Sequence, residues 1–328
     1  MRIFVAGATG ALGRRLVPML VARGHEVAGT TRSREKLAGL VAAGAEGALV
    51  DGLDREAVLA AVTRARPEVV VHQMTALADL RSPRRFDREF ALTNRLRSEG
   101  TAHLIAAAQA AGARRFVAQS YAGWPYARTG GPVKTEEDEL DPDPPRQMRR
   151  TLAAIRELEA AVLGARMEGM VLRYGGFYGP GTPLAVDGAI AKAVRRRQFP
   201  IVGGGTGVWS FVHIDDAASA TAAAVERGAP GVYNVVDDDP APVSEWLPAL
   251  ADALGARPPL RVPGWVGLLA IGRAGLSLMT STRGASNARA VRELGWRPRY
   301  PSWRQGFRAA VSAAPDPRPA PDARASPG

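Results

Sequence analysis

Three glycines near the start of the chain have the spacing of a loop that binds phosphate. They follow a short apolar run, residues 2–5, and precede apolar residues at helical spacing, which together predict a strand, a turn and a helix. In such a unit one glycine permits the tight turn, one lets the backbone approach a pyrophosphate, and one lets the helix pack against the strand. The spacing is GxxGxxG rather than GxGxxG, and the alternative is a plain glycine-rich turn. The residues predicted to bind a dinucleotide here are Gly7, Thr9, Gly10, Ala11, Leu12 and Gly13.

The residues at the end of the second predicted strand, which spans 25–30, indicate whether NAD or NADP binds. An acid about 20 residues beyond the glycines would hold the ribose 2′-OH of NAD. Here the tip has no carboxylate, and Arg32 lies 19 residues after Gly13. A guanidinium at this place would pair with the 2′-phosphate of NADP. The sequence therefore favours NADP, and the alternative is an ordinary surface arginine in an arginine-rich chain.

Other polar residues follow the later predicted strands. Residues 69–72 form an unbroken apolar run that ends in His72, as expected for a buried parallel strand. Ligands of parallel sheets lie beyond the carboxyl ends of the strands, so residues far apart in the chain should meet at one edge. Asp51 is placed to meet an adenine amino group, whereas Asp54 is predicted to cap the helix 55–64. The expected edge residues are Asp51, Gly52, Thr75, Gln119, Ser120 and Tyr121.

The elements that must position these residues alternate between strand and helix up to residue 121. This alternation predicts an α/β fold with a doubly wound parallel sheet, helices on both faces and right-handed crossovers. We expect a dinucleotide-binding domain over residues 1–181, to which part of 208–236 returns, and a smaller substrate domain mainly over 182–312. Residues 313–328 alternate Pro, Ala, Asp and Arg, and we expect a disordered tail there.

Several further segments carry expectations. Residues 123–145 are rich in Gly, Pro and acids, which predicts a functional lid or a disordered excursion. We expect residues 83–112 to be largely helical, and we expect helices over 148–163 and 185–197. Residues 264–279 are apolar, but Arg273 interrupts them and the run is short for a membrane span, so we expect a helix that roofs a pocket.

Composition excludes several kinds of chemistry. The chain of 328 residues has no cysteine, which excludes disulfides, thiolate catalysis and cysteine zinc sites. The four histidines are scattered, so we expect no metal site. The net charge of +11 comes with only 6% aromatic residues, which favours an anionic cofactor over nucleic acid. No signal peptide precedes the first strand, so we expect a cytoplasmic protein without a membrane partner.

Taken together, the motifs resemble the extended short-chain dehydrogenase/reductase family, of the NAD-dependent epimerase/dehydratase type. The resemblance implies a Rossmann domain with a small C-terminal substrate domain, and it places Gly176 and Phe177 against the nicotinamide. Homodimers are common in this family, so a homodimer is possible here. The matching landmarks are residues 7–13, Asp51, His72, Gly100-Thr101, Arg115-Phe116-Val117 with Ser120, Leu172-Arg173, Tyr178-Gly179-Pro180-Gly181, residues 211–216, Tyr233-Asn234 and residues 293–296.

The catalytic motif of that family is missing. The family uses a tyrosine and, four residues later, a lysine that lowers the phenol pKa, and a glutamate commonly follows four residues after the lysine. If Glu159 is that glutamate, the two positions hold Thr151 and Ile155. If Glu157 is, they hold Arg149 and Ala153. Residues 148–163 contain neither tyrosine nor lysine, so the chain resembles the atypical members.

Other residues are candidates for the proton donor. We hypothesise that Ser120 or Tyr121 hydrogen-bonds the substrate oxygen and that Tyr121, Tyr126 or Tyr174 donates the proton. Lys134 is a further basic candidate on the acidic segment. The alternative for each tyrosine is a packed aromatic ring with a satisfied hydroxyl.

Three functions fit these residues. The first is an NADP(H)-dependent oxidoreductase acting on the carbonyl or alcohol of a small, fairly hydrophobic molecule, since hydride transfer depends mainly on position and on the cofactor. The second is a non-redox isomerase, cyclase or dehydratase on the same scaffold. The third is a catalytically inactive regulator that senses NADP.

Overall fold

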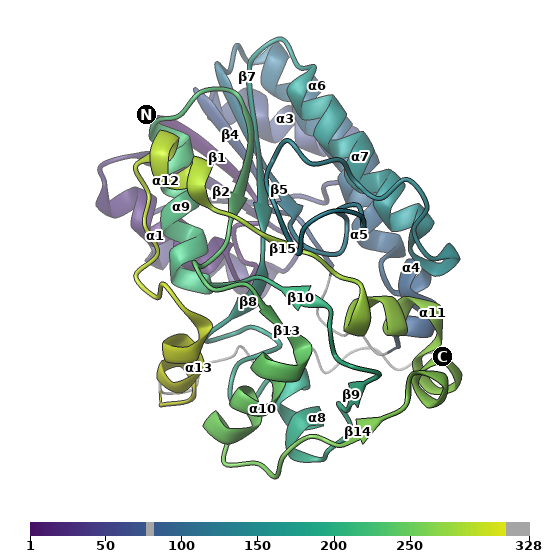
Figure 1. Cartoon of the computed structure of the whole chain (residues 1–328). Helices are drawn as coiled ribbons and strands as arrows, with labels where there is room; N and C mark the ends of the chain where they lie inside the picture. Colours follow the sequence, from purple (N-terminus) through teal and green to yellow (C-terminus); the bar gives the residue numbers. More distant parts are fainter. Residues whose placement is uncertain (77–81, 313–328) are drawn as a thin grey trace, which may run out of the picture.

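A sheet of seven parallel strands forms the centre of the molecule, in the order β12-β7-β5-β4-β1-β2-β3 (Figure 1). The structure is a computed structural model and describes residues 1–76 and 82–312. The order reverses between β1 and β4, as in a doubly wound fold, so the predicted Rossmann-type α/β architecture is confirmed. The strands are β1 (Arg2–Ala6), β2 (Glu26–Thr31), β3 (Glu46–Leu49), β4 (Val69–His72), β5 (Arg115–Tyr121), β7 (Glu168–Tyr174) and β12 (Gly231–Val235).

Helices cover both faces of this sheet because its strands are apolar on both sides. Ile3 and Val5 of β1 pack with α1 (Gly13–Ala22) and α9 (Ile214–Glu226). Phe4, between them, points to the opposite face. That face carries α3 (Arg55–Ala65), α6 (Thr101–Ala110) and α7 (Arg149–Leu163).

The remaining helices of the first half are short. The helical run expected over 83–112 is broken into four pieces before α6 begins. The last piece, η2, is a π-helical turn, and such turns are frequent at functional sites. These elements are α2 (Arg34–Ala42), η1 (Pro83–Arg85), α4 (Phe86–Glu89), α5 (Ala91–Arg95), η2 (Leu96–Gly100) and η3 (Arg146–Met148).

A second core lies in the C-terminal half around Phe211, Trp246 and Trp303. The helix expected over 185–197 begins only at Ala189, because residues 182–188 form turns in which Ala185 bonds to Thr182 and Gly188 bonds to Ala185. A final helix, α13, was not expected. The helices and larger strands here are α8 (Ala189–Arg195), α10 (Val243–Ala253), α11 (Gly264–Thr280), α12 (Ala288–Leu294), α13 (Trp303–Ser312), β8 (Gly176–Tyr178) and β11 (Phe211–His213).

Six two-residue strands form three small pairs over the described residues, and one of these pairs, β6 with β15, joins the two halves. The segment 123–145 is fastened, since its β6 pairs with β15 and the Glu136 carboxylate accepts the Asn234 N–H at 2.7 Å. It is therefore not the disordered excursion that was one of the two expectations. The tail expected over 313–328 lies outside the described residues. The short strands are β6 (Val133–Lys134), β9 (Ile201–Val202), β10 (Val208–Trp209), β13 (Ala241–Pro242), β14 (Arg261–Val262) and β15 (Gly284–Ala285).

The apolar helix α11 breaks at Gly272, whose φ of 70° and ψ of −177° suit glycine alone. Its first half carries exposed apolar side chains, among them Trp265 and Leu269. Its second half packs inward, where Ala274 is buried. Over the part of the chain that the structure describes, no helix is long and apolar enough to cross a membrane.

Candidate active site

The three glycines of the first loop have three different surroundings. Gly7 has φ of +88°, and a Cβ there would lie 2.8 Å from the Gln73 carbonyl. A Cβ on Gly13 would lie 2.4 Å from the Gly7 oxygen, so α1 begins in direct contact with the loop. Gly10 is exposed, and its nearest obstacle is 3.4 Å away. The backbone here is open toward solvent at a helix N-terminus, which fits a pyrophosphate.

Hydrogen bonds join this loop to the end of β2. The Gly7 N–H donates to Thr30 Oγ1 at 3.3 Å, and the Thr9 hydroxyl donates to Thr31 Oγ1 at 2.9 Å. Arg32 follows directly and is exposed. Within residues 1–76 and 82–312, its guanidinium has no hydrogen bond or ion pair. A cation is thus free beside the loop, as an NADP 2′-phosphate would require.

The ends of β3 and β4 complete this half of the edge. Asp51 is exposed, and its carboxylate accepts the Leu53 N–H at 3.0 Å. Gly52 is buried and leaves no room for a side chain, since a Cβ there would lie 2.3 Å from Met74 Sδ. The Asp54 carboxylate accepts the Ala57 N–H at 3.0 Å, which confirms the predicted helix cap.

Beyond β4 and β5 the edge continues with partly buried residues. Gln73 donates to the Tyr174 hydroxyl at 3.3 Å, while Thr75 and Gln119 are half-buried. The pairings of Ala6 with His72 and of His72 with Ala118 make these strand ends neighbours. Gly176 and Phe177 lie on β8, and the Phe177 ring is 5.4 Å from that of Tyr174. The predicted cofactor residues thus lie on adjacent strand ends, and their roles in binding stay predictions.

Helix α7 identifies the residues at the positions of the missing motif. Glu159 is buried, accepts the Ser120 hydroxyl at 2.7 Å and bonds Arg173 through both its oxygens, at 2.8 and 2.6 Å. Glu157 is exposed. Glu159 is therefore the inward glutamate, which favours the alignment that puts Thr151 and Ile155 at the tyrosine and lysine positions.

Neither of those residues offers a proton at the site. The Thr151 hydroxyl donates to Asp87 Oδ1 at 2.7 Å and accepts from Asn94 at 3.1 Å. Ile155 is buried and has no polar group. The described part of α7 thus carries a structural hydroxyl and an apolar side chain in place of an acid–base pair.

Two of the candidate tyrosines are engaged in the interior. The Tyr126 hydroxyl donates to Asn234 Oδ1 at 2.6 Å and accepts from Arg173 at 3.1 Å. The Tyr174 hydroxyl is 2.7 Å from Thr221 Oγ1, and burial raises the pKa of Tyr174. These two hydroxyls, and that of Ser120, which donates to Glu159, are thus engaged in buried hydrogen bonds within the protein. None of the three is free to donate a proton to a substrate in this arrangement.

Lys134 has a structural partner as well. Its ammonium is buried and lies 2.9 Å from the Asp138 carboxylate within the same segment. This pair holds the turn that follows β6, so Lys134 is not placed as a basic group beside the other candidates.

Tyr121 differs from the other tyrosines. It is half-buried and lines a small hollow together with Trp124, Trp209 and Leu278. Its hydroxyl has no hydrogen-bond partner within the described residues, and burial raises the pKa of Tyr121 to about 12. Leu278 comes from the last turns of α11, so this helix borders the hollow. At neutral pH the site therefore holds a protonated phenol in aromatic surroundings.

One buried cation escaped the sequence reasoning. Arg97, on η2, is only 5% exposed, and its guanidinium stands 5.9 Å from the Phe90 ring centroid. Thr93 and Thr101, four residues away on either side, are also buried, so the three side chains share one buried face of the helical run. All three are polar, so hydrophobic periodicity gave no signal for this face.

The landmark at residues 211–216 has a structural role. The His213 ring caps α9 by accepting the Asp215 N–H at 3.2 Å. The Asp216 carboxylate accepts the N–H groups of Arg299 and Tyr300, each at 2.9 Å. The motif therefore fastens the C-terminal segment to the sheet.

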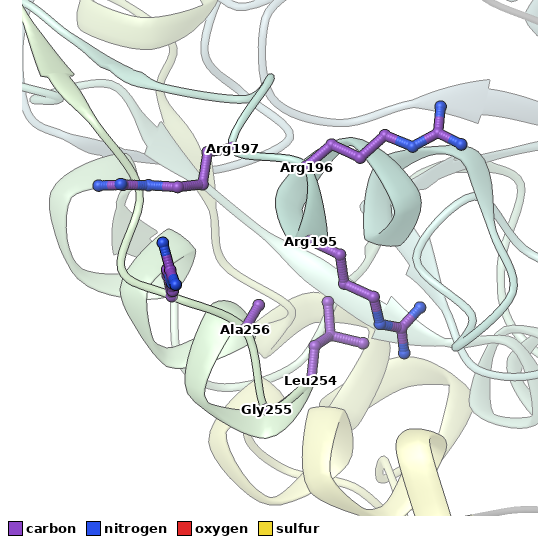
Figure 2. Close-up of a pocket in the computed structure, with 7 residues that line it drawn as sticks. Arg195, Arg196, Arg197, Leu254, Gly255 and Ala256 are labelled. Carbon is purple, nitrogen blue, oxygen red and sulfur yellow. The ribbon is translucent and has the colours of Figure 1, made fainter.

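An arginine-rich hollow lies elsewhere, between the ends of α8 and α10 (Figure 2). It measures about 470 Å³, and none of its lining residues belongs to the carboxyl edge of the sheet. Arg195 lies in the last turn of α8, where the helix dipole favours a cation. In Figure 2 the labelled arginines point in different directions, away from a common centre. We do not assign the dinucleotide to this hollow.

Comparison with known proteins agrees with this geometry. The model of the NAD dependent epimerase/dehydratase family matches residues 3–235. A Streptomyces protein named 3-diazoavenalumate denitrifying reductase is 49% identical over 309 residues, which cover 94% of this chain and 99% of that protein. A Stigmatella aurantiaca ketoreductase of a 3-oxo-dihydroquinoline oxide is 32% identical over 78% of this chain and 74% of its own length. A Stenotrophomonas maltophilia 2-alkyl-3-oxoalkanoate reductase is 29% identical over 78% and 76%.

Solved structures show the same fold. The Thermus thermophilus UDP-glucose 4-epimerase with NAD gives a TM-score of 0.73 at 26% identity, over 95% of this chain and 98% of that one. The Thermotoga maritima UDP-glucose 4-epimerase gives 0.74 at 23% identity, over 95% and 97%. The relatives support a reductase, and the family implies an NAD(P) cofactor. The chain belongs to the NAD dependent epimerase/dehydratase family.

Proposed function

We propose that the protein is an NADP(H)-dependent reductase of a small, fairly hydrophobic organic molecule. The observation that carries the choice of NADP is the exposed, unpaired Arg32 beside the glycine loop, at a strand tip without a carboxylate. The bound cofactor would supply the hydride. The open backbone at Gly10 and the N-terminus of α1 would hold the pyrophosphate, and Arg32 would hold the 2′-phosphate.

The lack of a proton-transfer pair on α7 suggests which acceptor suits the site. A carbon that receives hydride and expels a leaving group needs no proton. A diazonium carbon is of this type, because hydride forms the C–H bond while the C–N bond breaks and N₂ departs with the bonding electrons. The Streptomyces relative is named as a denitrifying reductase of a diazo compound. We therefore propose an aromatic diazo compound as the substrate class.

Carbonyl reduction is the second candidate. It consumes one proton for each hydride, so it needs a donor at the oxygen. The unpartnered phenol of Tyr121 favours it, as do the two relatives named for reduction of oxo compounds. The phenol would donate the proton while Trp124 and Trp209 exclude water from the acceptor.

One experiment distinguishes these possibilities. Wild-type protein, Tyr121→Phe and the control Tyr300→Phe are each given NADPH with an aryl diazonium salt or with aryl ketones, and NADPH consumption and N₂ release are measured. We expect one N₂ per NADPH, retained in all three proteins. Ketone turnover that falls by about 10²–10⁴-fold in Tyr121→Phe alone would instead establish carbonyl reduction with Tyr121 as the proton donor. Tight NADPH binding without turnover of either class would contradict the proposed reductase and favour the non-redox or sensor alternatives.

A further inference from the structure

Arg97 is a buried cation that forms no ion pair within residues 1–76 and 82–312. Its Nη1 is buried and has no hydrogen-bond partner within the described residues, and its guanidinium stands over the face of the Phe90 ring. Burial lowers the pKa of Arg97 to about 10, so the side chain stays charged at neutral pH. A buried charge that lacks a partner is strongly unfavourable, which makes such a group in a stable fold informative.

The carboxylate that acts on Arg97 is already committed. Among the described residues, Glu159 is the acid whose charge stabilises the Arg97 cation, and both its oxygens bond Arg173. Ser120 donates to the same carboxylate. Over the described residues this buried cluster therefore has two guanidinium groups for one carboxylate, so Arg97 Nη1 can still donate to an oxygen acceptor.

The place of Arg97 in the fold indicates which ligand that is. The Leu96 carbonyl accepts from His72 Nε2 at 3.2 Å, which fixes η2 to the end of β4. Asn94, one turn earlier, bonds Thr151, so η2 packs along α7. Arg97 thus lies on the segment that packs against the helix whose motif position has lost its basic residue.

The sheet order then relates Arg97 to the two halves of a dinucleotide. The glycine loop follows β1, and Arg32 and Asp51 follow β2 and β3 on one side of it. Arg97 is electrostatically coupled to Glu159, whose carboxylate meets Ser120 at the end of β5, on the other side of the loop. A dinucleotide laid across the switch point with its 2′-phosphate at Arg32 has its nicotinamide half on the Arg97 side.

We propose that Arg97 binds the nicotinamide half of the dinucleotide, by donating a hydrogen bond from its guanidinium to a ribose oxygen of that half. This inference rests on the proposed function. It assigns to η2 a cation that the α7 sequence no longer provides, and it explains why an arginine is kept on a buried helix face.

The test separates the two halves of the ligand. Isothermal titration measures NADPH and 2′,5′-ADP, which lacks the nicotinamide half, on wild type, Arg97→Met, Arg97→Lys and the control Arg95→Met. Arg95 is exposed and pairs with Glu99 on the same turn. We expect Arg97→Met to weaken NADPH at least tenfold without changing the affinity for 2′,5′-ADP. Arg97→Lys should recover part of the loss, and Arg95→Met should match wild type.

Thermal unfolding adds a readout that a merely structural arginine would not give. Without ligand, Arg97→Met should melt at the wild-type temperature or higher, because an unpaired buried charge is removed, while the stabilisation by NADPH should shrink. Unchanged NADPH affinity, equal loss for both ligands, or a lower melting temperature without ligand would overturn the inference. Wild-type protein that binds neither ligand would overturn the proposed function itself.

Discussion

The two halves of the carboxyl edge are built in different ways. Around Gly7 to Gly13 the ligand would be held by backbone, and the only side-chain charge needed is Arg32. Around α7 the site depends on side chains from several elements, and the family's proton-transfer pair is replaced by Thr151 and Ile155. The comparison teaches that the backbone features expected to bind the dinucleotide are retained, whereas the side chains expected to transfer a proton are exchanged. Four experiments test this contrast.

The largest effect is expected at the buried ion pair of the second half. Glu159→Gln leaves Arg173 and Arg97 without a carboxylate, and breaking a buried pair on one side costs about 3–5 kcal/mol. Chemical denaturation measures the loss. Glu157→Gln is the matched control on the exposed face of α7, and it should leave stability unchanged. Equal stabilities for the two variants would show that the buried ion pair of Glu159 does not stabilise this half of the edge.

A second effect concerns His72, which joins the two halves. Its ring is neutral, with Nε2 donating to the Leu96 carbonyl and Nδ1 accepting from the Met74 N–H. Burial lowers the pKa of His72 from 6.5 to about 4, so between these values the unfolded chain binds more protons than the folded one. Stability should therefore be complete above pH 6.5 and fall by about 3 kcal/mol as the pH drops to 4.

The measurement is denaturant unfolding across this range for wild type and His72→Gln. His72→Gln should not lose this stability between pH 6.5 and 4, whereas the control His103→Gln should lose it as wild type does. An identical pH profile for wild type and His72→Gln would contradict the assignment of a neutral, buried ring.

The glycine loop gives the next smaller change in stability. Gly13→Ala forces a Cβ to 2.4 Å from the Gly7 oxygen, a rigid backbone atom, and overpacking of this kind costs about 1–3 kcal/mol. Gly10→Ala meets nothing closer than 3.4 Å, so it should keep wild-type stability and lose only NADPH affinity. Calorimetry and NADPH titration of both variants separate the effects. An equal loss of stability in both variants would argue against an open backbone at Gly10.

Sequence reasoning predicted the first half of the edge because its signals are local. The glycines, the cap at Asp54 and the strand alternation act within a few residues, and the sheet confirms their arrangement. The same reasoning started α8 four residues early, because turns at 182–188 compete with a helix. It left α13 out altogether.

The second half could not be predicted in this way because it depends on contacts between distant segments. Nothing near Tyr126 shows that its hydroxyl meets Asn234, 108 residues away. The inward position of Glu159 becomes visible only when β5 and β7 bring Ser120 and Arg173 beside it. The sequence showed that the family's pair is absent, and only the fold shows what lies in its place.

The most direct test of the account is titration of NADPH and NADH against wild type, Arg32→Ala and the control Arg257→Ala, which removes an exposed arginine of the remote hollow. We expect wild type and Arg257→Ala to prefer NADPH. Arg32→Ala should bind NADPH about 10–100-fold more weakly, the size of a lost charge-assisted hydrogen bond, with unchanged NADH affinity. Equal weakening by both substitutions, or a preference for NADH in wild type, would contradict the proposed cofactor.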